Sequence, residues 1–142
     1  MRTILATALL LTALDAAAQC TTVAAICPTV VTAALTSDDC LSYDGSRYDL
    51  LQFSGTAGTT ITIDLRATSF DAFLGLIDPS GVPVAVSDDA SPGSTDAQLV
   101  YTLTSSGTWT VVANNLRSDA TGSYELAIAG CAAGPRSRAA RH

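Results

Sequence analysis

Residues 60–66 read Thr-Ile-Thr-Ile-Asp-Leu-Arg, and this stretch decides the fold class. Its aliphatic residues, Ile61, Ile63 and Leu65, alternate with polar ones, so a β-strand here carries all three on one face. The same period of two recurs in other short runs: Leu51 and Phe53; Leu74 and Leu76; Val84 and Val86; Leu99, Tyr101 and Leu103; Trp109, Val111 and Ala113; and Tyr124, Leu126 and Ile128. The pattern predicts an all-β chain.

Turn-forming residues separate these runs, at 54–58, 78–81, 91–93, 105–107 and 121–122. After residue 35, no helix start signal is followed by a run at the helical period, which disfavours α/β folds. Seven to eight short strands at this spacing predict a jelly-roll-like antiparallel β-sandwich over residues 41–131. Residues 19–40 are expected to form a lead-in that contains a first strand, and residues 132–142 a flexible basic tail.

The first 18 residues have the pattern of a signal peptide. Arg2 supplies a short basic region, residues 4–14 are largely apolar, and residues 16–18 are alanines of the kind that precede a cleavage site. We expect cleavage after Ala18 and a secreted, extracellular protein. The remaining sequence has no apolar run long enough to predict a transmembrane segment.

Four cysteines follow this segment, a number that can pair completely in an oxidising compartment. The alternative is lipidation of Cys20, which anchors the protein at the cell surface but leaves an odd number of cysteines. Three disulfide connectivities are open. We favour Cys20–Cys27, which closes a short loop, and Cys40–Cys131, which ties the start of the domain to its end. A zinc site is disfavoured by the cysteine spacing.

Composition argues against catalysis. Hydrophobic residues make up 48% of the chain and charged residues 14%, so the chain is expected to fold. Lysine is absent and the single histidine is the last residue, His142, which disfavours catalytic triads and phosphate-binding lysine loops. Twelve acids stand against three arginines between residues 19 and 133, so nucleic acid is not an expected partner. We predict that the protein is not an enzyme.

Several acids gather on either side of the predicted hairpin at residues 74–86. They are Asp71, Asp88, Asp89 and Asp96. A hairpin returns Asp88 towards Asp71, and carboxylate oxygens are the ligands that calcium prefers. One interpretation is therefore a calcium site; the other is that the acids are solvated and cap backbone N–H groups in their turns.

Six ordered motifs resemble one protein family. They are residues 48–53 (YDLLQF), 57–58 (AG), 71–76 with 78–81 (DAFLGL and DPSG), 87–89 (SDD), 106–111 (SGTWTV) and 122–126 (GSYEL). Over residues 35–131 the chain is similar to the bacterial pre-peptidase C-terminal domain, and Cys40 and Cys131 frame it as in a secreted variant. The resemblance implies a non-catalytic jelly-roll-like sandwich of the kind appended to secreted hydrolases, and some members bind calcium.

No peptidase precedes the domain in this sequence, so the resemblance implies a free-standing module. One hypothesis is an accessory or binding domain whose partner is an extracellular polymer, such as collagen, chitin or cell-wall material, or a secreted hydrolase. Its candidate contacts are the aromatic residues Tyr43, Tyr48, Phe70 and Phe73, which alternatively plug the ends of the core. The other hypothesis is an inert structural or surface protein without a ligand.

Overall fold

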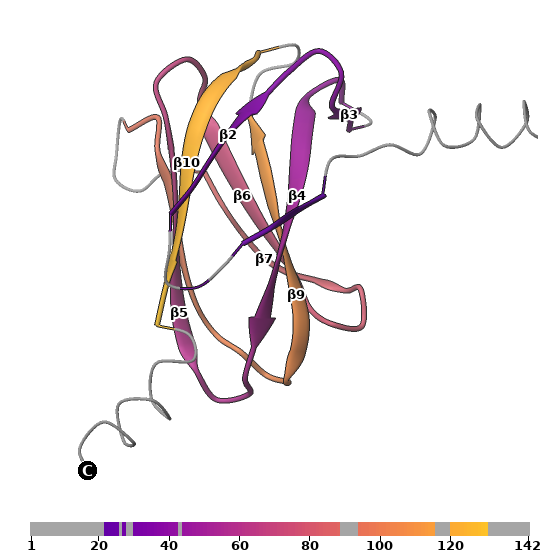
Figure 1. The fold of residues 1–142 in the computed structure, drawn as a ribbon, viewed down its shortest axis with the longest axis vertical. Coiled ribbons are helices and arrows are strands. Elements are labelled where there is room, and N and C mark those ends of the chain that lie inside the picture. The colour runs from indigo at the N-terminus through magenta and orange to yellow at the C-terminus, as the bar shows by residue number, and fades with distance from the viewer. Residues whose placement is uncertain are drawn as a thin grey trace, which may run out of the picture.

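The computed structural model describes residues 22–25, 27, 30–42, 44–88, 94–115 and 120–130. The described residues form ten strands and no helix. The strands lie in two facing sheets, with β2, β10 and β5 on one side of Figure 1 and β4 and β9 on the other. The predicted signal peptide, residues 1–18, and the predicted tail, residues 132–142, lie outside the described residues.

The first sheet has the strand order β1-β4-β9-β6-β7, and β3 also pairs with β4. Its strands are β1 (Thr22–Ala24), β3 (Cys40–Leu41), β4 (Arg47–Gly55), β6 (Ala72–Ile77), β7 (Pro83–Ser87) and β9 (Gly107–Asn115). The second sheet has the order β2-β10-β5-β8. It contains β2 (Val30–Leu35), β5 (Thr60–Ala67), β8 (Ala97–Thr102) and β10 (Gly122–Ala129).

The predicted all-β sandwich is confirmed, with one difference in strand direction. Every described strand pair is antiparallel except β1 with β4, which is parallel and places Thr22 opposite Leu50. A parallel neighbour requires a long connection. Here β2 and β3, which follow β1, intervene before β4 begins.

The core lies between the sheets and is built from the alternating residues. Ile61, Ile63 and Leu65 are completely buried. Trp109 of β9 is also buried and lies opposite Phe53 of the neighbouring strand β4 in the same sheet. Val86 departs from the prediction, because its side chain is 66% exposed. The register shifts between Leu76 and Ile77, and Val86 is paired with Gly75 on the outer side of the sheet.

Two of the four cysteines lie among the described residues. Cys27 and Cys40 are both disulfide-bonded, whereas Cys20 and Cys131 lie outside the described residues. Cys40 pairs with Tyr48 at the start of β4, and Gly130 lies against Thr60 at the opposite end of the sandwich. Each predicted bond, Cys20–Cys27 and Cys40–Cys131, therefore has one cysteine outside the described residues.

Candidate functional site

The outer side of the first sheet is free of charge on the strands β4, β9, β6 and β7. Its outward positions alternate with buried core residues, and they are Tyr48, Leu50, Gln52, Ser54, Phe73, Gly75, Ile77, Pro83, Val86, Thr108, Thr110, Val112 and Asn114. The whole chain carries a net charge of -6, so this uncharged surface stands apart from the acidic remainder. We call Tyr48, Leu50, Phe73, Ile77, Val86 and Val112 the apolar face.

The strand register arranges this face in rows. Asn114 lies opposite both Tyr48 on β4 and Phe73 on β6, so one amide separates two aromatic side chains. Because neighbouring strands are about 4.8 Å apart, Tyr48 and Phe73 stand on backbones about 10 Å apart. The next row runs through Leu50, Val112, Gly75 and Val86.

A shallow hollow opens in the apolar face, with a volume of about 470 Å³. Its lining comes from β3, β4, β6 and β9 and comprises Leu41, Ser42, Tyr48, Leu50, Ile77, Val112 and Asn114. Gly75 has no side chain and lies close beside Val112, so a Cβ added to Gly75 would lie 3.3 Å from the Val112 Cβ. The missing side chain lowers the surface at this point. Leu41 is 55% exposed at the rim. Such a combination of aromatic and aliphatic groups without charge is typical of the centre of a binding interface.

The four predicted aromatic contacts have different outcomes. Tyr48 and Phe73 are half-buried on the outer side of the sheet, in the same row. Phe70 is only 4% exposed and packs edge-on against Tyr124 in the core, with ring centroids 6.5 Å apart. Tyr43 lies outside the described residues. The structure therefore unites two of the four on one surface and assigns a third to the core.

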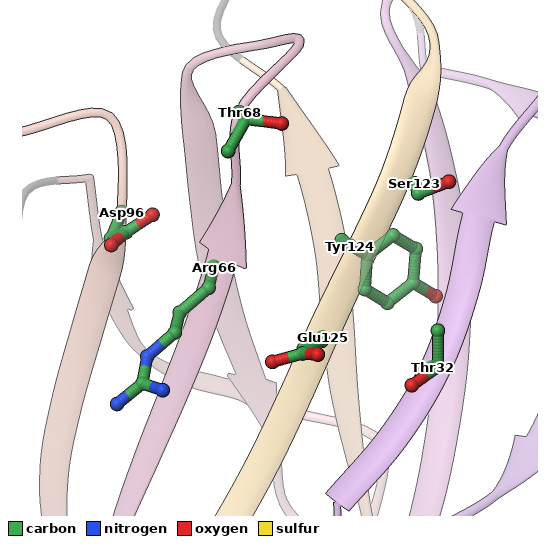
Figure 2. Close-up of a pocket in the computed structure, with 7 residues that line it drawn as sticks. All are labelled: Thr32, Arg66, Thr68, Asp96, Ser123, Tyr124 and Glu125. Carbon is green, nitrogen blue, oxygen red and sulfur yellow. The ribbon is translucent and has the colours of Figure 1, made fainter.

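A second hollow, of about 410 Å³, lies on the outer side of the other sheet (Figure 2). Its residues are Thr32, Arg66, Thr68, Asp96, Ser123, Tyr124 and Glu125. Glu125 of β10 lies opposite both Thr32 of β2 and Arg66 of β5. This surface is polar and charged, so the two outer sides of the sandwich differ in chemistry.

A buried polar cluster closes one end of the sandwich. The Tyr124 hydroxyl donates a 2.7 Å hydrogen bond to Asp49 Oδ2, joining the two sheets, and Asp49 is only 1% exposed. Burial raises the pKa of Asp49 to about 6 and also raises the pKa of Tyr124. Asp49 Oδ1 and Asn115 Oδ1 are buried without a hydrogen-bond partner. The hydrogen bond therefore ties β10 of the second sheet to β4 of the first.

Sequence reasoning did not select Asp49 as a special residue. The spacing in the sequence did carry a signal for its burial. Asp49 lies two residues before Leu51 and four before Phe53, so on a strand its side chain points to the same side as these two inward-facing residues. A carboxylate in phase with core residues predicts a buried acid that needs a hydrogen-bond donor. The donor itself, Tyr124, is 75 residues away in the chain.

The predicted calcium ligands are only partly described. Asp88 is exposed and follows Ser87, which pairs with Leu74, so the hairpin does return it towards Asp71. Asp71 Oδ1 is buried without a hydrogen-bond partner, which leaves one oxygen for a cation, whereas Asp96 Oδ1 accepts a bond from the Ala67 N–H. Asp89 lies outside the described residues. Among described positions no group of three or more His, Cys, Asp or Glu side chains could hold a metal.

A comparison with protein families finds a match for part of the chain. Residues 47–115, from the start of β4 to the end of β9, match the family model of the bacterial pre-peptidase C-terminal domain. This segment is similar to that family. The matched segment contains β4, β6, β7 and β9, and therefore every residue of the apolar face.

Solved structures agree on the fold. The pre-peptidase C-terminal domain of a collagenase from Bacillus anthracis is 13% identical, with a TM-score of 0.58 over 78% of this chain and 96% of that one. Periplasmic inhibitors of g-type lysozyme from Aeromonas hydrophila and Salmonella Typhimurium are 16% and 17% identical, with TM-scores of 0.51. They cover 78% and 77% of this chain and 97% of their own.

Other comparisons add two findings. No curated protein matches the chain. In the described part of the chain, no helix has the length and apolar character needed to cross a membrane.

Proposed function

We propose that the protein is a secreted, non-catalytic binding module whose apolar face holds an extracellular polymer. One observation carries the proposal: in a chain of net charge -6, the outer side of β4, β9, β6 and β7 presents the row Tyr48, Asn114 and Phe73 without a charged side chain. Removing such a surface from water does not require desolvation of an ion. Aromatic side chains contribute large buried areas in interfaces.

The aliphatic content of the face favours a polypeptide polymer over a polysaccharide. Leu50, Val112 and Val86 form the row beside the aromatic pair, and they offer contact area but no hydrogen bonds from their side chains. Asn114 Oδ1 accepts a 2.6 Å hydrogen bond from the Asn115 N–H, so its amide N–H groups are what it offers between the rings, and they suit a backbone carbonyl of the ligand. The similar domain of a collagenase supports collagen as the first polymer to test.

Two other outcomes remain alternatives to this proposal. The first is a secreted hydrolase as partner, which is supported by the fold shared with inhibitors of g-type lysozyme. The second is a surface protein without a ligand, in which the apolar face contacts other chains. The binding experiment described next also tests these two alternatives.

Cosedimentation with insoluble collagen, chitin and cell-wall material tests the proposal. We expect the protein to bind collagen and expect the double variant Tyr48→Ala/Phe73→Ala to bind at least about 10-fold more weakly, because buried aromatic residues dominate binding energy. Val86→Ala is the milder variant on the same face. Its matched control is Val100→Ala on the outer side of β8, where the exposed fraction is 60% against 66% for Val86.

Three results would contradict the proposal. Retained collagen binding by the double variant would place the site elsewhere. Equal losses in the two valine variants would show that the effect is not specific to the face. Binding to no polymer, together with inhibition of a g-type lysozyme, would support the hydrolase partner, whereas neither effect would support the inert surface protein.

We also propose a calcium site around Asp71, Asp88, Asp89 and Asp96, supported by the partnerless Asp71 Oδ1. Calcium should raise the thermal unfolding midpoint, because a ligand that binds only the native state stabilises it by mass action, by about 2.7 kcal/mol at 100 times the Kd. The measurement is a thermal melt in millimolar calcium and again in excess chelator. An unchanged midpoint, or an Asp88→Asn variant that responds as the parent does, would remove the site.

A further inference from the structure

We infer that the carboxyl groups of Asp39 and Asp49 share one proton, and that this proton acts as a latch that holds strand β3 against the sandwich. Asp39 lies directly before β3, and Asp49 lies on β4. Their exposed fractions are 7% and 1%, so both carboxyl groups are withdrawn from water. Two buried carboxylates side by side repel each other, and a pair that keeps one proton avoids this repulsion.

One oxygen of Asp49 lacks the donor that such a proton would supply. Asp49 Oδ2 accepts the Tyr124 hydroxyl at 2.7 Å, whereas Asp49 Oδ1 is buried without a hydrogen-bond partner. The Asp39 carboxyl group lies within hydrogen-bonding reach of Asp49, and this contact is one of the causes that raise the pKa of Asp49. Two ionised carboxylates offer only acceptors, so a hydrogen bond between them requires a proton on one of them.

The surroundings of the pair assign the proton to Asp49. Asp39 Oδ2 accepts the Thr36 N–H at 2.7 Å, so Asp39 already serves as an acceptor. Burial is the largest cause that raises the pKa of Asp49, to about 6. The result is a directed chain of hydrogen bonds, in which the Tyr124 hydroxyl donates to Asp49 and protonated Asp49 donates to Asp39.

The other charged or titratable groups around the pair come from β4 and β10. They are Tyr124 and Arg47, whose Nη1 donates a 2.7 Å hydrogen bond to the backbone carbonyl of Asp39. The neighbouring acids Asp38 and Asp44 are exposed to solvent. The inward-facing side chains of β2, β5 and β6 are uncharged, and β9 contributes an uncharged amide. Among described residues, the proton is therefore the group placed to neutralise the pair.

Loss of the proton should release β3. Since the folded pKa of Asp49 is the higher one, the stability from this group is full below about pH 4 and is lost as the pH rises through about 6. Strand β4 has neighbours on both edges, whereas Asp39 lies in a turn closed by its N–H and the Thr36 carbonyl at 3.2 Å. Repulsion between the carboxylates therefore displaces the turn and β3, within the limit set by the disulfide at Cys40.

The latch lies beside the hollow in the apolar face. Leu41 of β3 and the following Ser42 both line that hollow. β3 pairs with β4 only through Cys40 with Tyr48 and Leu41 with Arg47, so little else in the sheet holds it. The latch thus fixes one wall of the hollow at acidic pH and loosens it above about pH 6. This consequence rests on the proposed binding function, whereas the shared proton does not.

Carboxyl-carbon NMR of the full chain, labelled with ¹³C-aspartate, tests the shared proton directly. The variants Asp39→Asn and Asp49→Asn assign the two resonances. We expect both resonances to move together in a step near pH 6, because the proton lies between the two groups. A step for Asp49 near pH 4, or a step near pH 6 to which Asp39 does not respond, would overturn the inference.

A double-variant cycle, measured by urea unfolding at pH 7, provides a second test. Asparagine at either position supplies an N–H group in place of the proton, so each single variant should lower the unfolding equilibrium constant, by about 10-fold or more for Asp49→Asn. The double variant places an N–H group on both sides of the contact and should lose most of either gain. The control Asp38→Asn, at the exposed neighbouring residue, should change the constant by less than about threefold. Additive gains in the double variant would overturn the shared proton.

Cosedimentation with collagen between pH 5 and pH 7 tests the effect of the latch on the hollow. Binding by the parent should weaken as the pH rises through about 6, and binding by Asp49→Asn should stay constant over the same interval. Binding by the parent that does not change with pH would overturn the link between the latch and the hollow. Absence of collagen binding at every pH would contradict the proposed function instead, and the NMR and urea results would still decide the shared proton.

Discussion

Replacement of Trp109 by alanine is expected to lower the free energy of unfolding by about 3 to 5 kcal/mol. Trp109 is completely buried, and its indole N–H donates a 3.1 Å hydrogen bond to the Ser105 carbonyl. Gly55 packs so closely that an added Cβ would lie 2.7 Å from the Trp109 ring, so little nearby structure is free to fill the cavity. Urea unfolding provides the measurement.

The control for this prediction is Thr108→Ala. Thr108 precedes Trp109 in β9 but is exposed on the outer side of the sheet, so its loss should cost less than about 1 kcal/mol. A cost below about 1 kcal/mol for Trp109→Ala would show that the core collapses around the missing ring, contrary to the packing described above.

Replacement of Asp49 by asparagine is expected to stabilise the protein at neutral pH by about 1 to 3 kcal/mol. Burial raises the pKa of Asp49 from 3.8 to about 6, and one pKa unit corresponds to about 1.4 kcal/mol. Since the folded pKa is the higher one, the native state binds the proton more tightly, and stability from this group is lost as the pH rises from about 4 to about 6. Asparagine keeps an oxygen for Tyr124 but carries no charge.

Unfolding in urea at several pH values measures this effect. The difference between Asp49→Asn and the parent should be small near pH 4 and should reach its full size above about pH 6. Tyr124→Phe provides a matched variant of opposite sign, because the Tyr124 hydroxyl lowers the pKa of Asp49 and its loss should destabilise the protein most at high pH. A difference between Asp49→Asn and the parent that does not change with pH would contradict the assignment.

The core could be predicted from local sequence because strand burial has a local cause. Alternate side chains of a strand point to opposite faces, so the spacing of Ile61, Ile63 and Leu65 already identified the buried face. The same spacing located Leu51, Trp109 and Leu126 in the core. The family, too, followed from short motifs in order, and the match over residues 47–115 agrees with it.

The candidate site was only half predictable. Tyr48 and Phe73 were named as aromatic contacts, but so was Phe70, which is a core residue. All three stand near the start of a strand or in a preceding turn, where alternation is a weak guide to direction. The sequence also did not predict that Asn114 separates two of them, because that row depends on the register of three strands.

By itself, the sequence determined the all-β class, the inward faces of most strands and the family, since each depends on residues close together in the chain. Only the tertiary structure decided the apolar face, the Asp49–Tyr124 bond and the ends of the sandwich at which Cys27 and Cys40 lie. These features join residues tens of positions apart, as Tyr124 and Asp49 are by 75. Their proximity depends on strand order and register, which arise from packing the two sheets together and leave no periodic signal in a single strand.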